Sequence, residues 1–480
     1  MPDSGPHGIF ALEVDVARVA LTQGTVVTVA VEIVRSPDFA GEVTVAVAGL
    51  PTGATVEPLV LAQTETVKLI ELRCARDAQE TSWLTAEVVA QGGGVEQREP
   101  LVLRVTAPHG GLDATFGEAG VVLGPEDGTG AAHALVRLVG GALLVAGAKD
   151  VGVDAVPALW RYRADGTLDD GFGVGGEVVG GGEAGARYEV RQLAVAPDGA
   201  IALAGSIAPS GRSFVERRDS TGALDLAFGG GRVVVDAAAA EVTLVAHAVG
   251  GGVVVGVRRA GGLTLLAFDA AGGADLAFGD AGLLSPLVGE ERVPAEVAAF
   301  TAEGRVLAGA GVGNALLLTR FDDAFLPDVE FGVAGHVFVQ PRRGWLSAPA
   351  TALALVGEGD ALLCGGLAET SVLAVKPSGA TDLGFGDDGA AGIAPLRANA
   401  IGRDGNGSTY LLGDALGESV VARLDGIGEL ELPYGAQGFA RPGFASGSTP
   451  GGLAVADDGA VFAVGPDALP GHFRLVRIAP

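Results

Sequence analysis

Cysteine and methionine are scarce in this chain of 480 residues, which contains two of the former and one of the latter. Cys74 and Cys364 stand far apart, each in a short apolar stretch, so we expect two buried thiols rather than a disulfide framework. No apolar run approaches the roughly 18–20 residues that a membrane helix requires. The six histidines show no metal-ligand spacing, and we expect neither a zinc site nor any cofactor.

Positive charge is also in short supply. The chain has 31 lysines and arginines against 58 aspartates and glutamates, which gives a net charge of −27. Such a surface repels phosphate backbones and anionic membranes, so we expect no nucleic-acid partner and no membrane insertion. The opening "MPDSGPHG" has neither the basic nor the hydrophobic region of an export signal. We expect residues 1–7 to be a disordered or tether segment; this start fits both a chain whose leader was removed and a cytosolic protein.

Catalytic signatures are missing as well. No Gly-x-Ser-x-Gly nucleophile elbow occurs, and no glycine-rich stretch continues into the Gly-Lys-Ser/Thr of a phosphate-binding loop. The stretch "RDGNGST" (403–409) alternates Asp404, Asn406 and Ser408 as calcium loops do, but Ala415 stands where the bidentate glutamate is needed. We interpret it as a turn. The sequence therefore predicts no catalytic or metal-binding residue and favours a protein that is not an enzyme, although loop carboxylates leave that question open.

Residues 8–106 predict a small antiparallel sandwich. Runs such as "TVVTVAVEIV" and "GEVTVAVAGL" alternate apolar and polar residues, and turn residues separate the runs at intervals of roughly ten. The stretch "DFAGEVTVAVAGLPTGATVEP" (38–58) resembles the Ig-like modules of bacterial secreted and surface proteins, which carry a phrase of the type F-x-G-x-V-x-L-x-V-x-G-L-P-x-G. The resemblance implies an Ig-like β-sandwich over residues 8–106, and we expect "APHGG" (107–111) to be the linker.

A single phrase, Asp-x-x-Phe-Gly-x-x-Gly, recurs from residue 112 onwards. Clear copies are "LDATFGEAG", "LDDGFGVGG" and "LDLAFGGG", and a seventh, "ELPYGAQG", has tyrosine for phenylalanine. Between copies lie a hydrophobic strand, a tight turn and a second strand, as in "LAVAPDGAIALAG" (193–205), and then a third run such as "LWRYRADG". The aromatic positions are 49 to 56 residues apart: Phe116, Phe172, Phe228, Phe278, Phe331, Phe385 and Tyr434.

Four short strands per period are typical of propeller blades. The pattern also resembles the bacterial delta-60 repeat family, whose units carry LD-x-x-FG-x-x-G and DG-x-I-x-V-x-G. That resemblance covers residues 112–480 and implies a β-propeller, but no particular activity. We expect each aromatic side chain to fill the wedge between blades, the glycines to adopt positive φ, and the aspartate to accept backbone N–H groups.

The two ends of the repeat region predict how the ring closes. We label the strands of each blade A to D from the innermost outwards. The region begins with a D strand near 117–124 and ends with A, B and C strands within 452–479, and pairing them completes a blade without open edges. The predicted fold is all-β: an N-terminal Ig-like β-sandwich followed by a seven-bladed β-propeller, closed by an N-terminal outer strand that pairs with the C-terminal three strands.

Strand order divides the propeller loops between two faces. The A–B turns and C–D connections, on what we call the aspartate face, collect many aspartates, whereas the D–A and B–C loops, on the arginine face, collect arginines and some aromatics. Guanidinium and aromatic groups suit carboxylates, sulfates and sugar rings. The longest loop of the arginine face is "QPRRGWLSAPA" (340–350). The predicted ligand-binding residues are Arg187, Tyr188, Arg258, Arg259, Arg342, Arg343, Trp345 and Arg441.

The leading hypothesis is a non-enzymatic, extracytoplasmic protein, secreted, periplasmic or surface-tethered, that acts as a binding module or scaffold. Its propeller face opposite the Ig-like domain would contact a glycan, an envelope polymer or a protein. This inference rests partly on fold, which constrains function weakly. One alternative is a carbohydrate-active hydrolase or lyase that uses loop residues of the same face, and another is a structural subunit of a surface assembly. We expect a monomer.

Overall fold

A computed structural model of the chain describes residues 9–15, 18–22, 26–75, 78, 81, 84–106, 110–125, 127, 129–235, 241–312, 315–340, 349–357, 359–366 and 369–480. The predicted tether, residues 1–7, lies outside this set. The fold is all-β, and the described residues include one 3₁₀ turn, η1 (Gly229–Gly231). No helix among them has the length and apolar character needed to cross a membrane. The chain divides into two compact units, Met1–His109 and Gly110–Pro480.

The unit Met1–His109 consists of two β-sheets that share one hydrophobic core. Along β7, Ile70, Leu72 and Cys74 are buried and the residues between them are exposed, as expected for a strand with one face on the core. Val43 of β4 and Leu103 of β9 join the same core from the other sheet, so the unit is a β-sandwich. One sheet has the order β1 (Phe10–Val14), β3 (Val26–Arg35), β7 (Val67–Cys74), β5 (Ala54–Val56), and the other β2 (Arg18–Thr22), β9 (Val95–Thr106), β8 (Leu84–Gly92), β4 (Val43–Ala48), β6 (Leu59–Leu61).

The unit Gly110–Pro480 repeats an antiparallel group of four strands. A bridge between Ala155 and Arg187 joins the first two groups into one eight-stranded sheet, and a hairpin, β23 (Leu287–Val288) and β24 (Val293–Pro294), precedes the fourth. We number the groups 1 to 7 in chain order of their first strands. They are β11 (Gly130–Arg137), β12 (Leu143–Val151), β13 (Asp154–Tyr162), β14 (Glu177–Val179); β15 (Arg187–Val195), β16 (Ile201–Ala208), β17 (Arg212–Arg218), β18 (Arg232–Val235); β19 (Glu241–His247), β20 (Val253–Arg259), β21 (Gly262–Phe268), β22 (Leu283–Leu284); β25 (Val297–Phe300), β26 (Val306–Val312), β27 (Ala315–Arg320), β28 (His336–Val339); β29 (Ala350–Val356), β30 (Asp360–Gly365), β31 (Thr370–Val375), β32 (Ala390–Ile393); β33 (Arg397–Arg403), β34 (Thr409–Ala415), β35 (Glu418–Leu424), β36 (Phe439–Ala440); and β37 (Leu453–Val455), β38 (Val461–Pro466), β39 (Phe473–Ile478) with β10 (Val121–Gly124).

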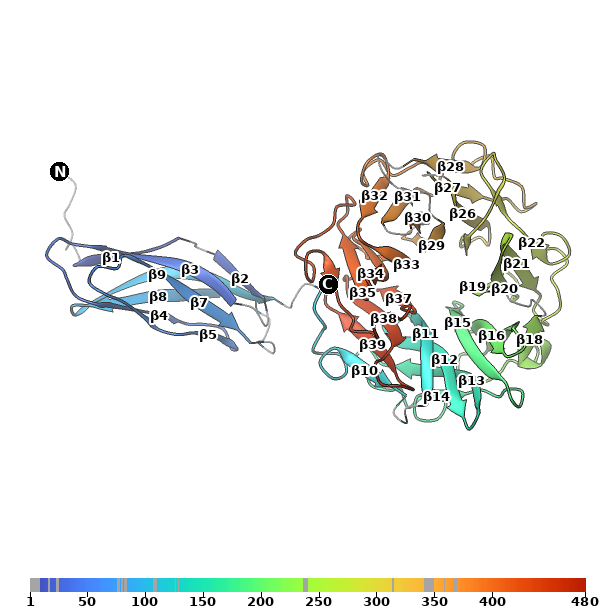
Figure 1. Cartoon of the computed structure of the whole chain (residues 1–480), viewed down its shortest axis with the longest axis horizontal. Coiled ribbons are helices and arrows are strands. Elements are labelled where there is room, and N and C mark those ends of the chain that lie inside the picture. The colour runs from blue at the N-terminus through green and yellow to red at the C-terminus, as the bar shows by residue number, and fades with distance from the viewer. Residues whose placement is uncertain are drawn as a thin grey trace. The chain divides into compact units, whose positions relative to one another are not determined.

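The first strands of these groups surround a central opening, and the unit is propeller-like (Figure 1). Within the described residues each first strand contacts the next, in the order β11, β15, β19, β25, β29, β33 and β37, and β37 contacts β11 again. The circle is thus closed by side-chain packing between groups. Because each first strand begins after a D–A loop, the starts of these strands lie on the arginine face of the ring.

Group 7 joins the two ends of the repeat region. β10 pairs antiparallel with β39, with Val121 opposite Val476 and Gly124 opposite Phe473. Phe473 in turn packs against Trp160 of group 1, with ring centroids 5.0 Å apart. The predicted pairing of an N-terminal outer strand with the three C-terminal strands is confirmed.

An arginine on the third strand links the recurring phrase to its group of strands. In group 1 the Arg161 guanidinium donates to Asp169 (2.7 Å) and lies 4.6 Å from the centre of the Phe172 ring. Asp169 also accepts the amide N–H of Gly171 (3.1 Å), which holds the turn. The aspartate and the buried aromatic follow the sequence prediction, whereas the arginine partner was not predicted. The same trio occurs in groups 2 and 4, as Arg217, Asp225, Phe228 and Arg320, Asp328, Phe331.

The glycine after each aromatic residue has a left-handed backbone. At Gly173, φ is 56°, and a Cβ would meet the carbonyl oxygen of Glu177 at 2.1 Å, so only glycine fits. The predicted positive φ is confirmed at all seven positions, where it lies between 53° and 58°: Gly117, Gly173, Gly229, Gly279, Gly332, Gly386 and Gly435.

The first prediction tests the aromatic wedge. Phe228 is fully buried, so Phe228→Ala is expected to lower the free energy of unfolding by about 3–5 kcal/mol. Leu226 lies in the same turn but is 72% exposed, and Leu226→Ala is expected to change that free energy by about 0.5 kcal/mol or less. Urea unfolding of the full-length variants measures both values, and equal losses would contradict a structural role for the aromatic.

The second prediction concerns acid stability. The Asp328 side chain is 6% exposed and lies between Arg305 (2.5 Å) and Arg320 (2.8 Å). Burial raises its pKa, but the amide of Glu330 and Arg320 outweigh burial, so that the pKa is lowered overall. The resulting stabilisation is present above the unfolded-state pKa of about 3.9 and is lost as pH falls through the lower folded-state pKa.

Asp328→Asn removes the carboxylate that both guanidinium groups share and leaves Arg305 with only its longer contact to Asp323 (3.9 Å), so we expect a loss on the order of 3 kcal/mol at neutral pH. The loss should shrink as pH falls from neutral through the lowered folded-state pKa, because the parent carboxyl then becomes protonated as well. Urea titrations of parent and variant across this range measure the difference, and a difference that does not depend on pH would refute the ion-pair explanation.

Candidate functional site

A β-bulge near the start of five inner strands turns one residue out of the ladder. In β11, Ala132 pairs with Gly147 and Ala134 with Ala146, so that His133 has no partner of its own. The same shift occurs in β15, β19, β29 and β33. Bulges re-aim side chains, and here each bulged residue is polar although the strands are otherwise rich in alanine, valine and leucine. The bulged residues are His133, Arg191, Thr243, Thr351 and Asn399.

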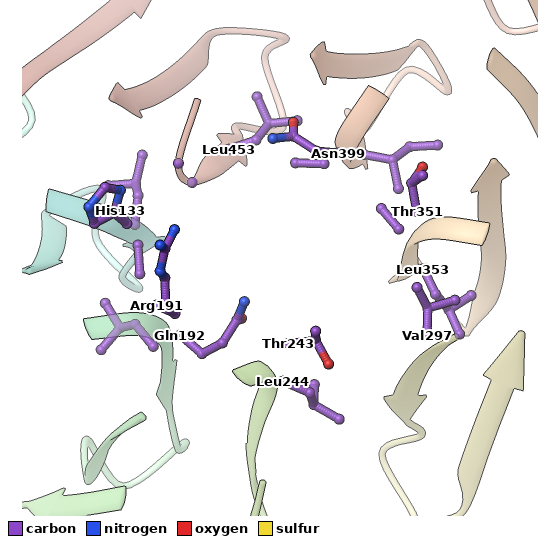
Figure 2. A pocket seen from close by; sticks show the side chains of 18 of the residues that line it. His133, Arg191, Gln192, Thr243, Leu244, Val297, Thr351, Leu353, Asn399 and Leu453 are labelled. Atoms are coloured by element: carbon purple, nitrogen blue, oxygen red, sulfur yellow. The ribbon is translucent and has the colours of Figure 1, made fainter. Parts of the chain in front are cut away.

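These five residues line a cavity of about 290 Å³ in the central opening, which we call the inner cavity (Figure 2). Gln192 and Arg258 add further polar groups, and the remaining walls are largely aliphatic, with Leu244 and Leu353 among them. In Figure 2, His133 and Arg191 lie across the opening from Thr351. The sequence thus delivers polar side chains from five different groups to one level of the ring.

A second cavity of about 540 Å³, which we call the mouth, shares His133, Arg191, Thr243 and Asn399 with the inner cavity. It adds residues at the starts of inner strands and in the loop before β37, and therefore opens on the arginine face. Its charged members include both signs. The added polar residues are Glu241, Arg397, Asp414, Ser448 and Thr449.

Groups 4 and 7 differ from the others at the bulged position. Glu296 occupies it in group 4, but its carboxylate accepts the amides of Gly311 (2.9 Å) and Ala350 (2.6 Å) and serves the backbone. Group 7 has Gly451 there, and a Cβ would meet the carbonyl oxygen of His133 at 2.5 Å. Of the residues that line the inner cavity, none is acidic.

His133 sits in a small charged cluster. Its Nε2 lies 3.7 Å from Glu189, which also pairs with Arg191 at 2.6 Å. Burial lowers the pKa of His133 below its ordinary value, and the positive charge of Arg191 lowers it further against the opposing effect of Glu189. At neutral pH the imidazole is therefore uncharged and offers one donor and one acceptor nitrogen.

Several polar atoms around the cavities have no partner within the described protein. They are Oγ1 of Thr243, Oδ1 of Asn399 and Nε of Arg258, all of them buried. Asn399 is held by its amide nitrogen, which donates to the carbonyl of Pro450 (3.0 Å). Because an unpaired buried polar atom destabilises the folded protein by about 1–3 kcal/mol, a ligand that forms hydrogen bonds with such atoms removes this penalty and binds more tightly.

The structure separates the predicted ligand-binding residues. Arg258 lines both cavities. Arg187 is engaged by Asp150 (2.6 Å) outside them, and Arg441 by Glu418 (2.9 Å) at the surface. Arg259, beside Arg258, is exposed and lines neither cavity. The loop residues Arg342, Arg343 and Trp345 lie outside the described residues.

The expected exposure of Tyr188 on the arginine face is wrong. Its side chain is 2% exposed, packs edge-on against Phe214 (5.1 Å) and accepts a hydrogen bond from Arg232 (3.1 Å). The prediction placed residue 188 in a loop, whereas β15 begins at Arg187 and turns the next side chain into the core. Sequence reasoning missed the bulged residues for the same reason: it placed the inner strands too late and expected them to be apolar.

The acidic residues that the structure describes include no metal-binding cluster and no carboxyl group with a raised pKa. No cluster of three or more potential metal-binding side chains occurs in the part of the chain that the structure describes. A general acid needs a raised pKa, yet each carboxyl group with a displaced pKa is displaced downward, as for Asp169, Asp328 and Asp467.

The third prediction tests the His133 cluster. Arg191→Gln removes a positive charge and is expected to raise the pKa of His133, whereas Glu189→Gln removes a negative charge and is expected to lower it. NMR titration of the imidazole C–H signals in the full-length variants measures both shifts. Shifts of the same sign in the two variants would contradict the arrangement.

Comparison with known proteins gives no family. No family model and no curated protein matches the chain. Among solved structures it is similar to prolyl oligopeptidase B from Galerina marginata, with 12% identity and a TM-score of 0.40 over 70% of this chain and 47% of that one. It is also similar to a mutant Salmonella alpha-2-macroglobulin, with 9% identity and a TM-score of 0.17 over 97% of this chain and 28% of that one. The chain spans less than half the length of either protein, and such low TM-scores carry no argument about function.

Proposed function

We propose that the chain is a non-enzymatic binding protein whose inner cavity and mouth accept a glycan or another polar polymer end. In this proposal Gly110–Pro480 is a seven-bladed β-propeller of the delta-60 type, and Met1–His109 is an Ig-like module that tethers it outside the cytoplasm. The repeated four-stranded groups and the phrase Asp-x-x-Phe-Gly-x-x-Gly support the propeller. The two-sheet sandwich supports the Ig-like module.

The observation that carries the proposal is the ring of bulged polar residues. A channel that only closed the fold would be lined by the alanine, valine and leucine of the other inner positions. Here five strands deliver His133, Arg191, Thr243, Thr351 and Asn399 to one level. Cavities in which several polar groups converge beside aliphatic walls are typical of ligand sites.

The alternative of a hydrolase or lyase has less support. Glycoside hydrolysis uses two carboxyl groups, one of them with a raised pKa. The acidic residues among those that line the mouth are Glu241 and Asp414, on groups 3 and 6. Neither lies within the inner cavity, where a substrate would be held by the polar ring.

A structural subunit of an assembly is a second candidate, favoured by exposed aliphatic residues on the aspartate face. Groups 2 to 6 each place one such residue directly after the acidic residue of the recurring phrase, and each is at least 64% exposed. An exposed apolar patch marks an interaction surface where its members are contiguous, and in this alternative the five residues together contact the partner. The residues are Leu226, Leu276, Val329, Leu383 and Leu432.

The fourth prediction tests the proposed function. A panel of neutral and acidic glycans should include ligands that raise the melting temperature of the full chain, since a ligand that binds only the folded state stabilises it. Thr243→Val is isosteric and removes a hydroxyl without a partner, so the fold should persist while binding weakens by about 1 kcal/mol. Asn406→Ala, in an exposed turn of the aspartate face, is the control and should bind normally.

Hydrogen exchange of the complex locates the ligand. Protection at the starts of β11, β15 and β33 supports the proposal. Protection confined to the C–D turns favours the docking alternative, and turnover of a glycan favours the enzyme. An absence of stabilisation by every glycan would contradict a glycan-binding role.

A further inference from the structure

The inner cavity has a charge opposite to that of the protein as a whole. The chain carries a net charge of −27, yet the charged residues that line this cavity are Arg191 and Arg258, and none of the lining residues is acidic. A cleft with one sign of charge and low-dielectric walls concentrates its field. The cavity is therefore a cationic site within an acidic molecule.

Arg258 differs from the arginines that maintain the fold. Arg161, Arg217 and Arg320 each pair with an aspartate of the recurring phrase. Arg258 has no ion-pair partner among the described residues, although Glu241 lies opposite it in the β19–β20 register. Its Nε is buried and unpaired. A guanidinium in this state is ready for an anionic group from outside the chain.

Arg191 is held in position for the same group. Glu189 pairs with it at 2.6 Å but lines neither the inner cavity nor the mouth. The ion pair with Glu189 holds the Arg191 side chain in place, and the Glu189 carboxylate itself does not line either cavity. His133, next to it, is uncharged at neutral pH and can donate or accept a hydrogen bond. One wall of the cavity, from groups 1 to 3, thus favours an anion.

The opposite wall is neutral and hydrogen-bonding. In Figure 2, Thr351 lies across the opening from His133 and Arg191, and Asn399 lies between them at the top of the view. Leu244 and Leu353 supply apolar surface. A cavity of about 290 Å³ lies at the small end of the range for ligand sites. These features fit a compact molecule with a carboxylate on one side, hydroxyl groups on the other and a partly apolar ring.

We infer that the inner cavity binds an acidic sugar residue, a uronic acid at the end of a glycan, with its carboxylate on Arg258 and Arg191 and its hydroxyl groups on Thr351 and Asn399. This inference rests on the proposed function and specifies its ligand. Amines are disfavoured by the two guanidinium groups, and neutral sugars lose the charged contact.

The test compares matched sugars and matched arginines in the full-length protein. The probes are D-glucuronate and D-galacturonate, with D-glucose and D-galactose as their neutral counterparts, and affinity is measured by calorimetry at low and raised salt. At least one uronate should bind about tenfold or more tightly than its neutral counterpart, because charge-assisted hydrogen bonds exceed neutral ones. Raised salt should reduce this advantage.

Arg258→Gln should lower the affinity for that uronate about tenfold or more and leave the affinity for the neutral sugar unchanged. Arg259→Gln removes the same charge from the next residue, outside the cavity, and should change neither affinity. Melting temperatures of both variants should match the parent, because neither arginine forms an ion pair with another residue that the structure describes.

Four results overturn the inference. Equal affinity for uronates and neutral sugars, or equal losses in Arg258→Gln and Arg259→Gln, refutes the carboxylate site while leaving a glycan-binding protein in place. Binding of the neutral sugars without binding of either uronate also refutes the carboxylate site and leaves a glycan-binding protein in place. Absence of binding by all four sugars, together with an absence of stabilisation in the glycan panel, contradicts the inference and the proposed function together.

Discussion

The ring depends on one repeated interaction, in which an aspartate holds both the turn that it begins and an arginine of the preceding strand. The arginine lies over a buried aromatic ring, so that charge, hydrogen bond and apolar wedge are fixed together. The interaction ties the third strand of a group to the start of the fourth. Two groups lack the arginine: group 3 has Ala267 at this position and group 5 has Ala374. Phe278 of group 3 is only partly buried, whereas Phe385 of group 5 is fully buried. In group 5, Lys376 reaches Asp382 at 2.9 Å.

The outer part of the ring, which carries this interaction, differs from the inner part in how its residues repeat. The turns between third and fourth strands repeat nearly the same residues in each group, because each must satisfy the same local geometry. The equivalent positions of the inner strands share a β-bulge in five groups but do not share their side chains. Their side chains are histidine, arginine, threonine, glutamate, threonine, asparagine and glycine in groups 1 to 7. The repeated residues build the ring, whereas the varied ones include both the residues that line the inner cavity and Glu296, which binds backbone amides.

The features that repeat in every group could be predicted from the sequence, whereas the bulged residues, which vary from group to group, could not. The aromatic wedge, the left-handed glycines and the pairing of β10 with β39 all follow from recurring local patterns. A bulge, in contrast, adds one residue to a strand and reverses the alternation on either side of it. A strict period of two therefore assigns His133 or Asn399 to the wrong face. The prediction for Tyr188 was wrong for a related reason. An error of one residue in the start of a strand moves a side chain from the surface to the core.

The pairing of β10 with β39 also has a consequence for biosynthesis. A chain leaves the ribosome from its N-terminus, so β10 emerges before every other strand of the ring, and β39 emerges after them. Until β39 is made, β10 has no partner and β38 has an unpaired edge, which are the conditions that favour pairing with other chains. A nascent ring can assemble its middle groups, but it cannot close. The ring therefore closes only after β39 has been translated. A chain that ends before β39 keeps the unpaired edges of β10 and β38, which can pair with strands of other chains.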